Sequence, residues 1–160
     1  MGRAPGFSTR RTAAINGESG DSGDGDPAMA RVNQRAVDAI RLALQRFPGL
    51  SAEGLPILDR NYAPLDPWVN YTQAQVHTAM DYLRVEQASC KRNKTLGSYT
   101  LKHRAERHVE ECFRREIDTA TLYVSNGAMI AAAIGLGFKV EPNDPGRSLN
   151  AMITVPKAVQ

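Results

Sequence analysis

Basic residues concentrate in one stretch of this chain. Between Arg84 and Arg115 there are nine lysines and arginines but only four acidic residues. Such side chains bind phosphate oxygens by charge and hydrogen bonding, without reading a base sequence. The stretch therefore predicts a surface for nucleic acid or for another acidic partner. The candidate residues are Lys91, Arg92, Lys94, Lys102, Arg104, Arg107, Arg114 and Arg115.

Most of these residues fall on one predicted helix that has two distinct faces. At about 100° per residue, its arginines share one side, and Glu111 is the acidic residue among them. This side also fits an ordinary solvated helix face. The opposite face is apolar and is expected to be buried; it consists of Leu101, Ala105, Val109, Cys112 and Phe113.

The residues needed for catalysis do not occur in recognisable patterns. His103 and His108 are five positions apart, so they do not share a helix face. His108 and Cys112 are four apart and offer two metal ligands, whereas a catalytic zinc usually takes three from the protein. The sequence also contains no HExxH, GxSxG, GxGxxG or GxxxxGK motif. We therefore predict no catalytic residue, no metal site and no cofactor.

A polar triplet precedes an apolar run near the C-terminal end. Ser125, Asn126 and Gly127 stand where a helix would begin. Free amides at a helix N-terminus can hold an anion, which makes Ser125 and Asn126 candidate anion-binding residues. The same residue types commonly cap a helix, and capping is the favoured interpretation.

Apolar periodicity predicts the elements that position these residues. We expect four helices, at 30–46, 72–89, 98–117 and 128–136. Thr72 and Ser98 are the expected N-caps of the second and third helices. The predicted helix 128–136 is apolar on all sides, so Ile130 and Ile134 should be buried.

The remaining segments predict a connector, a turn, short strands and a tail. Residues 48–70 contain four prolines and form an ordered, irregular connector, and residues 90–97 form a basic turn. Residues 119–124 are extended, and 138–140 and 151–155 form a hairpin. Residues 1–30 are a low-complexity, disordered tail. The predicted fold is mainly helical (α+β), with about four helices and a small C-terminal β-hairpin in one globular domain, 31–160.

Composition sets limits on the class of protein. The formal net charge is +3, and 42% of the residues are hydrophobic, which is ordinary for a globular domain. No apolar run is long enough to span a bilayer, so no membrane partner is expected. The two cysteines are 22 positions apart and form no disulfide framework, which favours a reducing, cytoplasmic location.

Two resemblances add to this interpretation. The runs GSYTLKHRAE (97–106) and YVSNGAMIAAA (123–133), with Gly137-Phe138, resemble a pattern in short uncharacterised bacterial, plasmid and phage proteins. This resemblance implies a mobile-element origin and no particular activity. The segment 126–138, followed by a strand, is similar to the closing helix and strand of GCN5-related N-acetyltransferases, which also need an upstream sheet and a Gly-rich loop.

Two hypotheses follow. The preferred one is a non-enzymatic accessory protein of a mobile element that binds nucleic acid, or an acidic protein, through the basic helix face. The alternative is a small acyltransferase of the GCN5-related type.

Overall fold

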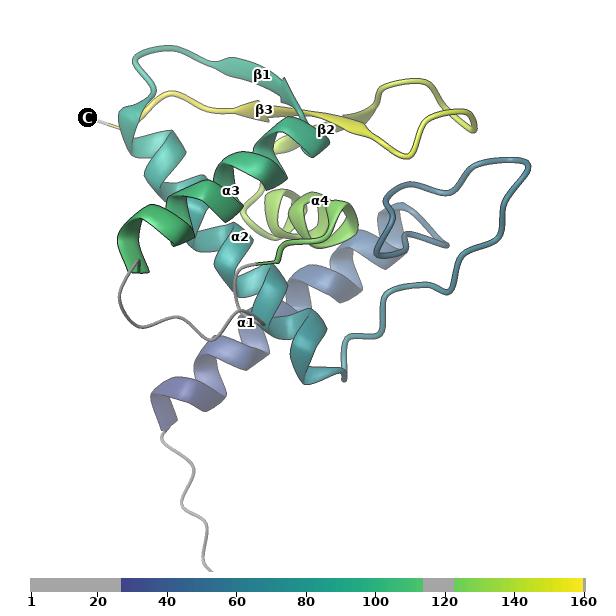
Figure 1. Ribbon diagram of the computed structural model, residues 1–160, viewed down its shortest axis with the longest axis horizontal. Coiled ribbons are helices and arrows are strands. Elements are labelled where there is room, and N and C mark those ends of the chain that lie inside the picture. Colours follow the sequence, from purple (N-terminus) through teal and green to yellow (C-terminus); the bar gives the residue numbers. More distant parts are fainter. Residues whose placement is uncertain (1–26, 114–122, 160) are drawn as a thin grey trace, which may run out of the picture.

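The computed structural model describes residues 27–113 and 123–159, which form four helices and a three-stranded sheet (Figure 1). The helices are α1 (Pro27–Arg46), α2 (Asn70–Ser89), α3 (Ser98–Phe113) and α4 (Asn126–Gly135). The strands are β1 (Lys94–Gly97), β2 (Lys139–Pro142) and β3 (Ala151–Val155). The predicted α+β class with four helices is confirmed. Most of the predicted tail, 1–26, lies outside the described residues, and residues 27–30 open α1.

Helix α4 forms the centre of the fold. Every residue from Asn126 to Ile134 is buried, as predicted for Ile130 and Ile134. Helices α1 and α2 pack against α4 on one side, and the sheet lies on the other (Figure 1). A Cβ atom at Gly135 would lie 2.4 Å from the Cβ of Ala39, so the absent side chain lets α1 approach closely. In the described part of the chain, no helix is both long and apolar enough to cross a membrane.

The sheet is antiparallel, with the strand order β1-β3-β2. The two strands predicted as a C-terminal hairpin pair as β2 and β3, but they belong to a three-stranded sheet rather than to a separate hairpin. The expectation of a basic turn over 90–97 is wrong for residues 94–97, because these form β1 and pair with β3. Leu96 lies opposite Ile153 and packs against the core, which stabilises the extended conformation. Thr95 also favours a strand, because β-branched residues are enriched in strands.

Helix α2 begins at Asn70, two residues before the expected cap. Thr72 is therefore not its N-cap; Val69 stands there and makes no side-chain capping bond. The preceding turn is instead closed by Asp66, whose carboxylate accepts the Trp68 N–H at 2.9 Å. The side chain of Gln73 then reaches back to the carbonyl of Pro67. These two bonds fix the entry into α2 without Thr72.

Helix α3 follows β1 directly. The Ser98 hydroxyl accepts the Ala151 N–H, so it ties α3 to β3. The predicted apolar face is correct for Leu101 and Ala105, which are fully buried, but not for Cys112, which is exposed. The contacts of α3 with the core therefore lie in its first turns. The predicted end of this helix at 117 and most of the predicted extended segment, 119–124, lie outside the described residues.

The connector between α1 and α2 is ordered and irregular, as predicted. Backbone bonds tie it to the loop between β2 and β3, including one from the Leu55 N–H to the Leu149 carbonyl at 2.9 Å. Leu55 and Leu65 are buried, whereas Leu58 and Trp68 are 83% and 65% exposed.

Candidate nucleic-acid interface

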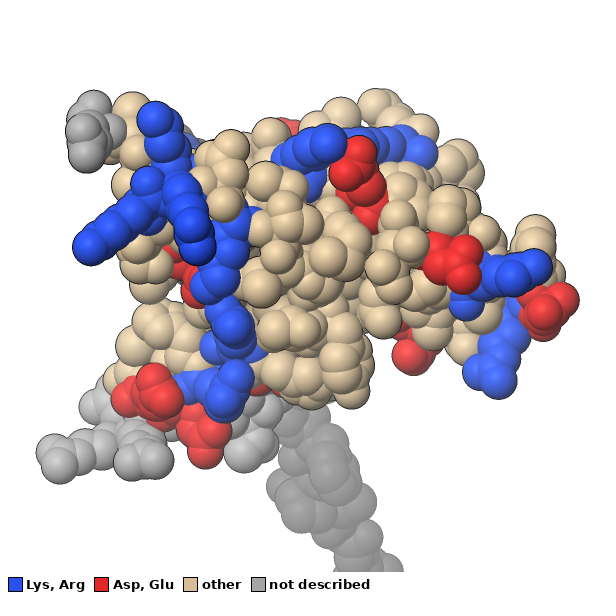
Figure 2. All heavy atoms as spheres, turned by 90° about the horizontal axis from the view of Figure 1, so that it is seen from above, with Lys and Arg blue, Asp and Glu red and all other residues tan. Residues whose placement is uncertain are grey.

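The candidate interface lies where the end of α2, β1 and the outer side of α3 meet. Five predicted residues lie on β1, on α3 or in the turn between α2 and β1, and we refer to them as the basic surface: Lys91, Arg92, Lys94, Arg104 and Arg107. A band of lysine and arginine atoms runs down one side of the face in Figure 2, with acidic atoms at its lower end. Arg114 and Arg115 lie outside the described residues.

A single carboxylate organises this region. Glu86 on α2 is 13% exposed and accepts a hydrogen bond from the Tyr82 hydroxyl at 2.7 Å. Its Oε1 atom also accepts from Lys94 Nζ at 3.2 Å and from Arg104 Nη1 at 3.4 Å. Glu86 therefore holds a strand residue and a residue of α3 against α2. Two of the residues predicted to bind phosphate thus have a protein partner already.

The ionisation of the Glu86–Tyr82 pair follows from these contacts. Burial raises the pKa of Glu86, but the hydrogen bonds from Tyr82 and Lys94, with the charges of Lys94 and Arg104, outweigh it. The pKa of Glu86 therefore lies below its ordinary value. Burial and the bond to Glu86 raise the pKa of Tyr82, which keeps its hydroxyl protonated as a donor. Glu86 is consequently a carboxylate at neutral pH.

We expect Glu86→Gln to lower the free energy of unfolding by about 1–2 kcal/mol at pH 7, because it removes the charge that three donors share. A lowered pKa in the folded state contributes stability above the ordinary carboxyl pKa and loses it as pH falls through the lowered value. The difference between wild type and variant should therefore shrink below about pH 4. Urea unfolding at several pH values measures this. An equal difference at every pH would contradict it, and Glu141→Gln, in an exposed pair with Lys139, is the control.

Lys102 does not lie on the open surface. Its side chain is 9% exposed and its Nζ atom lies 3.7 Å from Glu106 Oε1. The same Nζ lies 4.9 Å from the ring centroid of Tyr123 and 5.4 Å from that of Tyr99, at cation–π distance. Glu106 also accepts the Val124 N–H. Lys102 therefore helps to join α3 to the residues that precede α4, and little of it is accessible to a phosphate.

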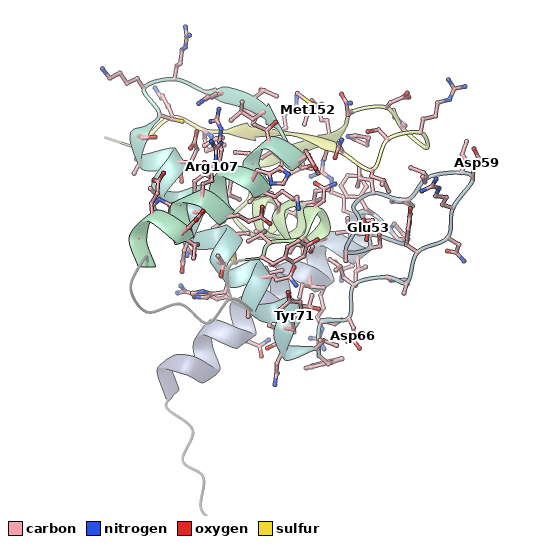
Figure 3. The ribbon with its side chains drawn as sticks, viewed as in Figure 1. Glu53, Asp59, Asp66, Tyr71, Arg107 and Met152 are labelled. Carbon is pink, nitrogen blue, oxygen red and sulfur yellow. The ribbon has the colours of Figure 1, made fainter. Side chains whose placement is uncertain are left out.

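Arg107 is the exposed arginine of the described part of α3. Figure 3 shows it in the left part of the view, with the connector acids Glu53, Asp59 and Asp66 to its right. Glu110 and Glu111 are also exposed on α3. The predicted arginine face, with Glu111 as the acidic residue among its arginines, therefore also has the exposed Glu110 close to Arg107.

The residues at the start of α4 are buried and make internal bonds. Ser125 caps the helix, since its hydroxyl accepts the Ala128 N–H at 3.2 Å. The Asn126 amide group donates to the carbonyls of Glu53 and Leu149 and to Asn150 Oδ1. The Gly127 N–H donates to the Ala52 carbonyl. The favoured interpretation of capping is therefore confirmed. For Ser125 and Asn126, anion binding stays a prediction, to which these bonds lend no support.

The histidines and cysteines offer no metal cluster. Cys112 Sγ lies 3.7 Å from His108 Nε2, which agrees with the two-residue pair seen in the sequence. Among the described residues, no group of three or more His, Cys, Asp or Glu could hold a metal ion. Both cysteines are free thiols.

Sequence reasoning missed Lys157, which the fold brings next to the basic surface but which is not part of it. Its backbone N–H donates to Asn93 Oδ1 at 3.0 Å, and the next residue, Ala158, donates to the Cys90 carbonyl at 2.9 Å. Lys157 is exposed. The signal is the strand 94–97. Because it pairs with β3, the residues that follow β3 must lie next to the turn before β1.

Comparison with known proteins gives no relative, since no family model, curated protein or solved structure matches this chain. The described residues before α4 are helical or irregular apart from β1 and isolated bridges. They do not supply the upstream sheet that the resemblance to acetyltransferases requires.

Proposed function

We propose that this chain is a non-enzymatic accessory protein that binds nucleic acid by its phosphates through the basic surface. The observation that carries the proposal is the imbalance of charge there. The basic surface brings together five cations, and Glu86 is the one carboxylate that the described residues place in ion pairs with them. Within the described residues, Lys91, Arg92 and Arg107 have no ion pair, and all three are exposed.

The two paired cations also support binding. Lys94 and Arg104 are held in place by Glu86, so a phosphate that approaches them would order fewer side-chain rotamers. One carboxylate cannot neutralise both charges. Lys94 remains 45% exposed and Arg104 34% exposed, so both remain accessible to a second partner.

The arrangement favours contact with the nucleic-acid backbone rather than with bases. A recognition helix that enters the major groove presents polar side chains to base edges. Helix α4 is buried, so it cannot enter a groove. Helix α3 exposes Glu110 and Glu111 beside Arg107, and the phosphates that line a groove would repel these two carboxylates. We therefore expect binding that depends weakly on sequence and strongly on salt.

The test compares two triple variants by fluorescence anisotropy with a duplex DNA at about 50 mM salt, where screening is limited. Lys91→Ala/Arg92→Ala/Arg107→Ala removes three unpaired cations of the basic surface. Arg60→Ala/Lys139→Ala/Arg147→Ala removes the same charge from exposed residues elsewhere. We expect the first variant to lose most of the affinity and to flatten the salt dependence by about one unit of log–log slope per lost contact. The second should bind like the wild type.

Three outcomes contradict the proposal. The wild type could fail to bind DNA or RNA at this salt concentration. Both triple variants could lose affinity equally, which would show a response to net charge alone. Finally, the wild type could bind an acidic protein but no nucleic acid, which would assign the basic surface to the other class of partner.

A further inference from the structure

A cavity lies beside the basic surface. It measures about 740 Å³ and lies between the end of α2 and the C-terminal segment after β3. Its volume falls in the range of small-molecule sites, about 300–1,000 Å³. The end of the described chain lies next to the turn between α2 and β1 in Figure 1. The lining residues are Ala88, Ser89, Cys90, Lys91, Lys157, Ala158 and Val159.

Two hydrogen bonds from backbone N–H groups hold the walls of this cavity together. The Ala158 N–H donates to the Cys90 carbonyl at 2.9 Å, and the Lys157 N–H donates to Asn93 Oδ1 at 3.0 Å. The pairing of Lys94 with Val155 in the sheet continues the same contact. Residues far apart in the sequence therefore form one site, and Lys157 stands in it together with Lys91.

The charges in the cavity are unbalanced. Lys91 and Lys157 both line it, and no acidic residue does so in the described part of the chain. Two ammonium groups in one site repel each other, and a bound anion offsets that repulsion. The free carbonyls at the end of α2 disfavour an anion, but they also favour the positive charge of Lys91 beside them. A ligand with two negative charges gains most from this pair.

The rest of the lining is small and largely apolar. Ala88, Ala158 and Val159 offer carbon surface, and Ser89 already donates its hydroxyl hydrogen to the Glu86 carbonyl. A phosphate monoester carries about −1.5 to −2 charge at pH 7, which matches two lysines better than a carboxylate does. The apolar walls would contact an organic group attached to that phosphate, which inorganic phosphate lacks.

We infer that this cavity binds a phosphate monoester of a small organic group. In the setting of the proposed function, on which this part of the inference rests, the ligand is the 5′-phosphorylated end of a nucleic-acid strand. A free nucleoside monophosphate carries the same phosphate monoester on an organic group. The position of Lys157 beside the basic surface favours the strand end, because the following phosphates of the strand would then meet Arg92 and Lys94.

The experiment uses the full chain and two single-stranded oligonucleotides of one sequence, with a 5′-phosphate or a 5′-hydroxyl. We expect the phosphorylated strand to bind about fivefold more tightly. An excess of adenosine 5′-monophosphate should compete for the cavity and make the two strands bind equally. Adenosine and inorganic phosphate should leave the difference in affinity unchanged. Lys157→Ala should abolish the preference and keep the affinity for the hydroxyl strand. Lys139→Ala, at an exposed lysine of β2, should change neither.

The outcomes separate this inference from the proposed function. Strong, salt-dependent binding of both strands with equal affinity, and no binding of adenosine 5′-monophosphate, would overturn the inference and leave the proposed function standing. Binding of adenosine 5′-monophosphate that depends on Lys157, without binding of either strand, would support the cavity as a site for free phosphate monoesters and reject the strand end. Equal displacement by inorganic phosphate would overturn the role of the apolar walls.

Discussion

Replacing Ile130 with alanine is expected to lower the free energy of unfolding by about 2–5 kcal/mol, the range for large-to-small changes in a core. Ile130 is fully buried in α4, the helix that contacts α1, α2, α3 and both hairpin strands. The loss of three carbon atoms at this point leaves a void that several elements line. Such a void cannot collapse without moving one of them.

Urea unfolding followed by circular dichroism measures this effect. Val85→Ala is the control, because Val85 lies on α2 and is 49% exposed, and its loss should cost less than about 1 kcal/mol. If Ile130→Ala cost no more than Val85→Ala, the central place of α4 in the core would be wrong.

The sequence predicted the parts of the fold in which local pattern and tertiary packing agree. Helix α4 has no polar side, and a helix of this kind has to be buried on all sides. The polar triplet before it predicted the cap at Ser125, and the segments 138–140 and 151–155 predicted the pairing of β2 with β3. In each case the residues that form the element also determine where it packs.

The sequence failed where a distant residue decides the structure. β1 depends on its pairing with β3, more than fifty residues away, and a pattern confined to 90–97 does not contain that information. Its charge and its place on the predicted helix make Lys102 a candidate for the basic surface. It is buried because Glu106 and two tyrosine rings surround its ammonium group. Partners of this kind cannot be found from helical spacing alone.

The candidate interface was predicted in outline but not in its internal contacts. The basic stretch was visible as a local excess of charge, and Lys91, Arg92 and Arg107 are exposed as expected. The role of Glu86 was not visible, because its contacts to Lys94 and Arg104 join three elements. Charge composition therefore indicates the region. Among the described residues, only the fold shows which of its cations have an acidic partner and which do not.

Replacing Gly127 with alanine is expected to destabilise the fold by about 3 kcal/mol, at the upper end of the range for overpacking. An added Cβ would lie 1.8 Å from the Ser51 carbonyl oxygen and 2.9 Å from its carbon. Both atoms belong to the backbone, so no side-chain rotation relieves the contact. The connector would have to move away from α4, which breaks the bond from the Gly127 N–H to the Ala52 carbonyl.

Thermal and urea unfolding of Gly127→Ala, beside Gly97→Ala, test this expectation. At Gly97 the nearest atom to an added Cβ is Thr100 Oγ1 at 3.9 Å, so that variant should stay within about 0.5 kcal/mol of the wild type. The connector and Arg107 lie on different sides of the molecule (Figure 3). Gly127→Ala should therefore lower stability but keep the affinity of the folded protein for DNA at low temperature. Wild-type stability in this variant would show that the connector does not press against the start of α4.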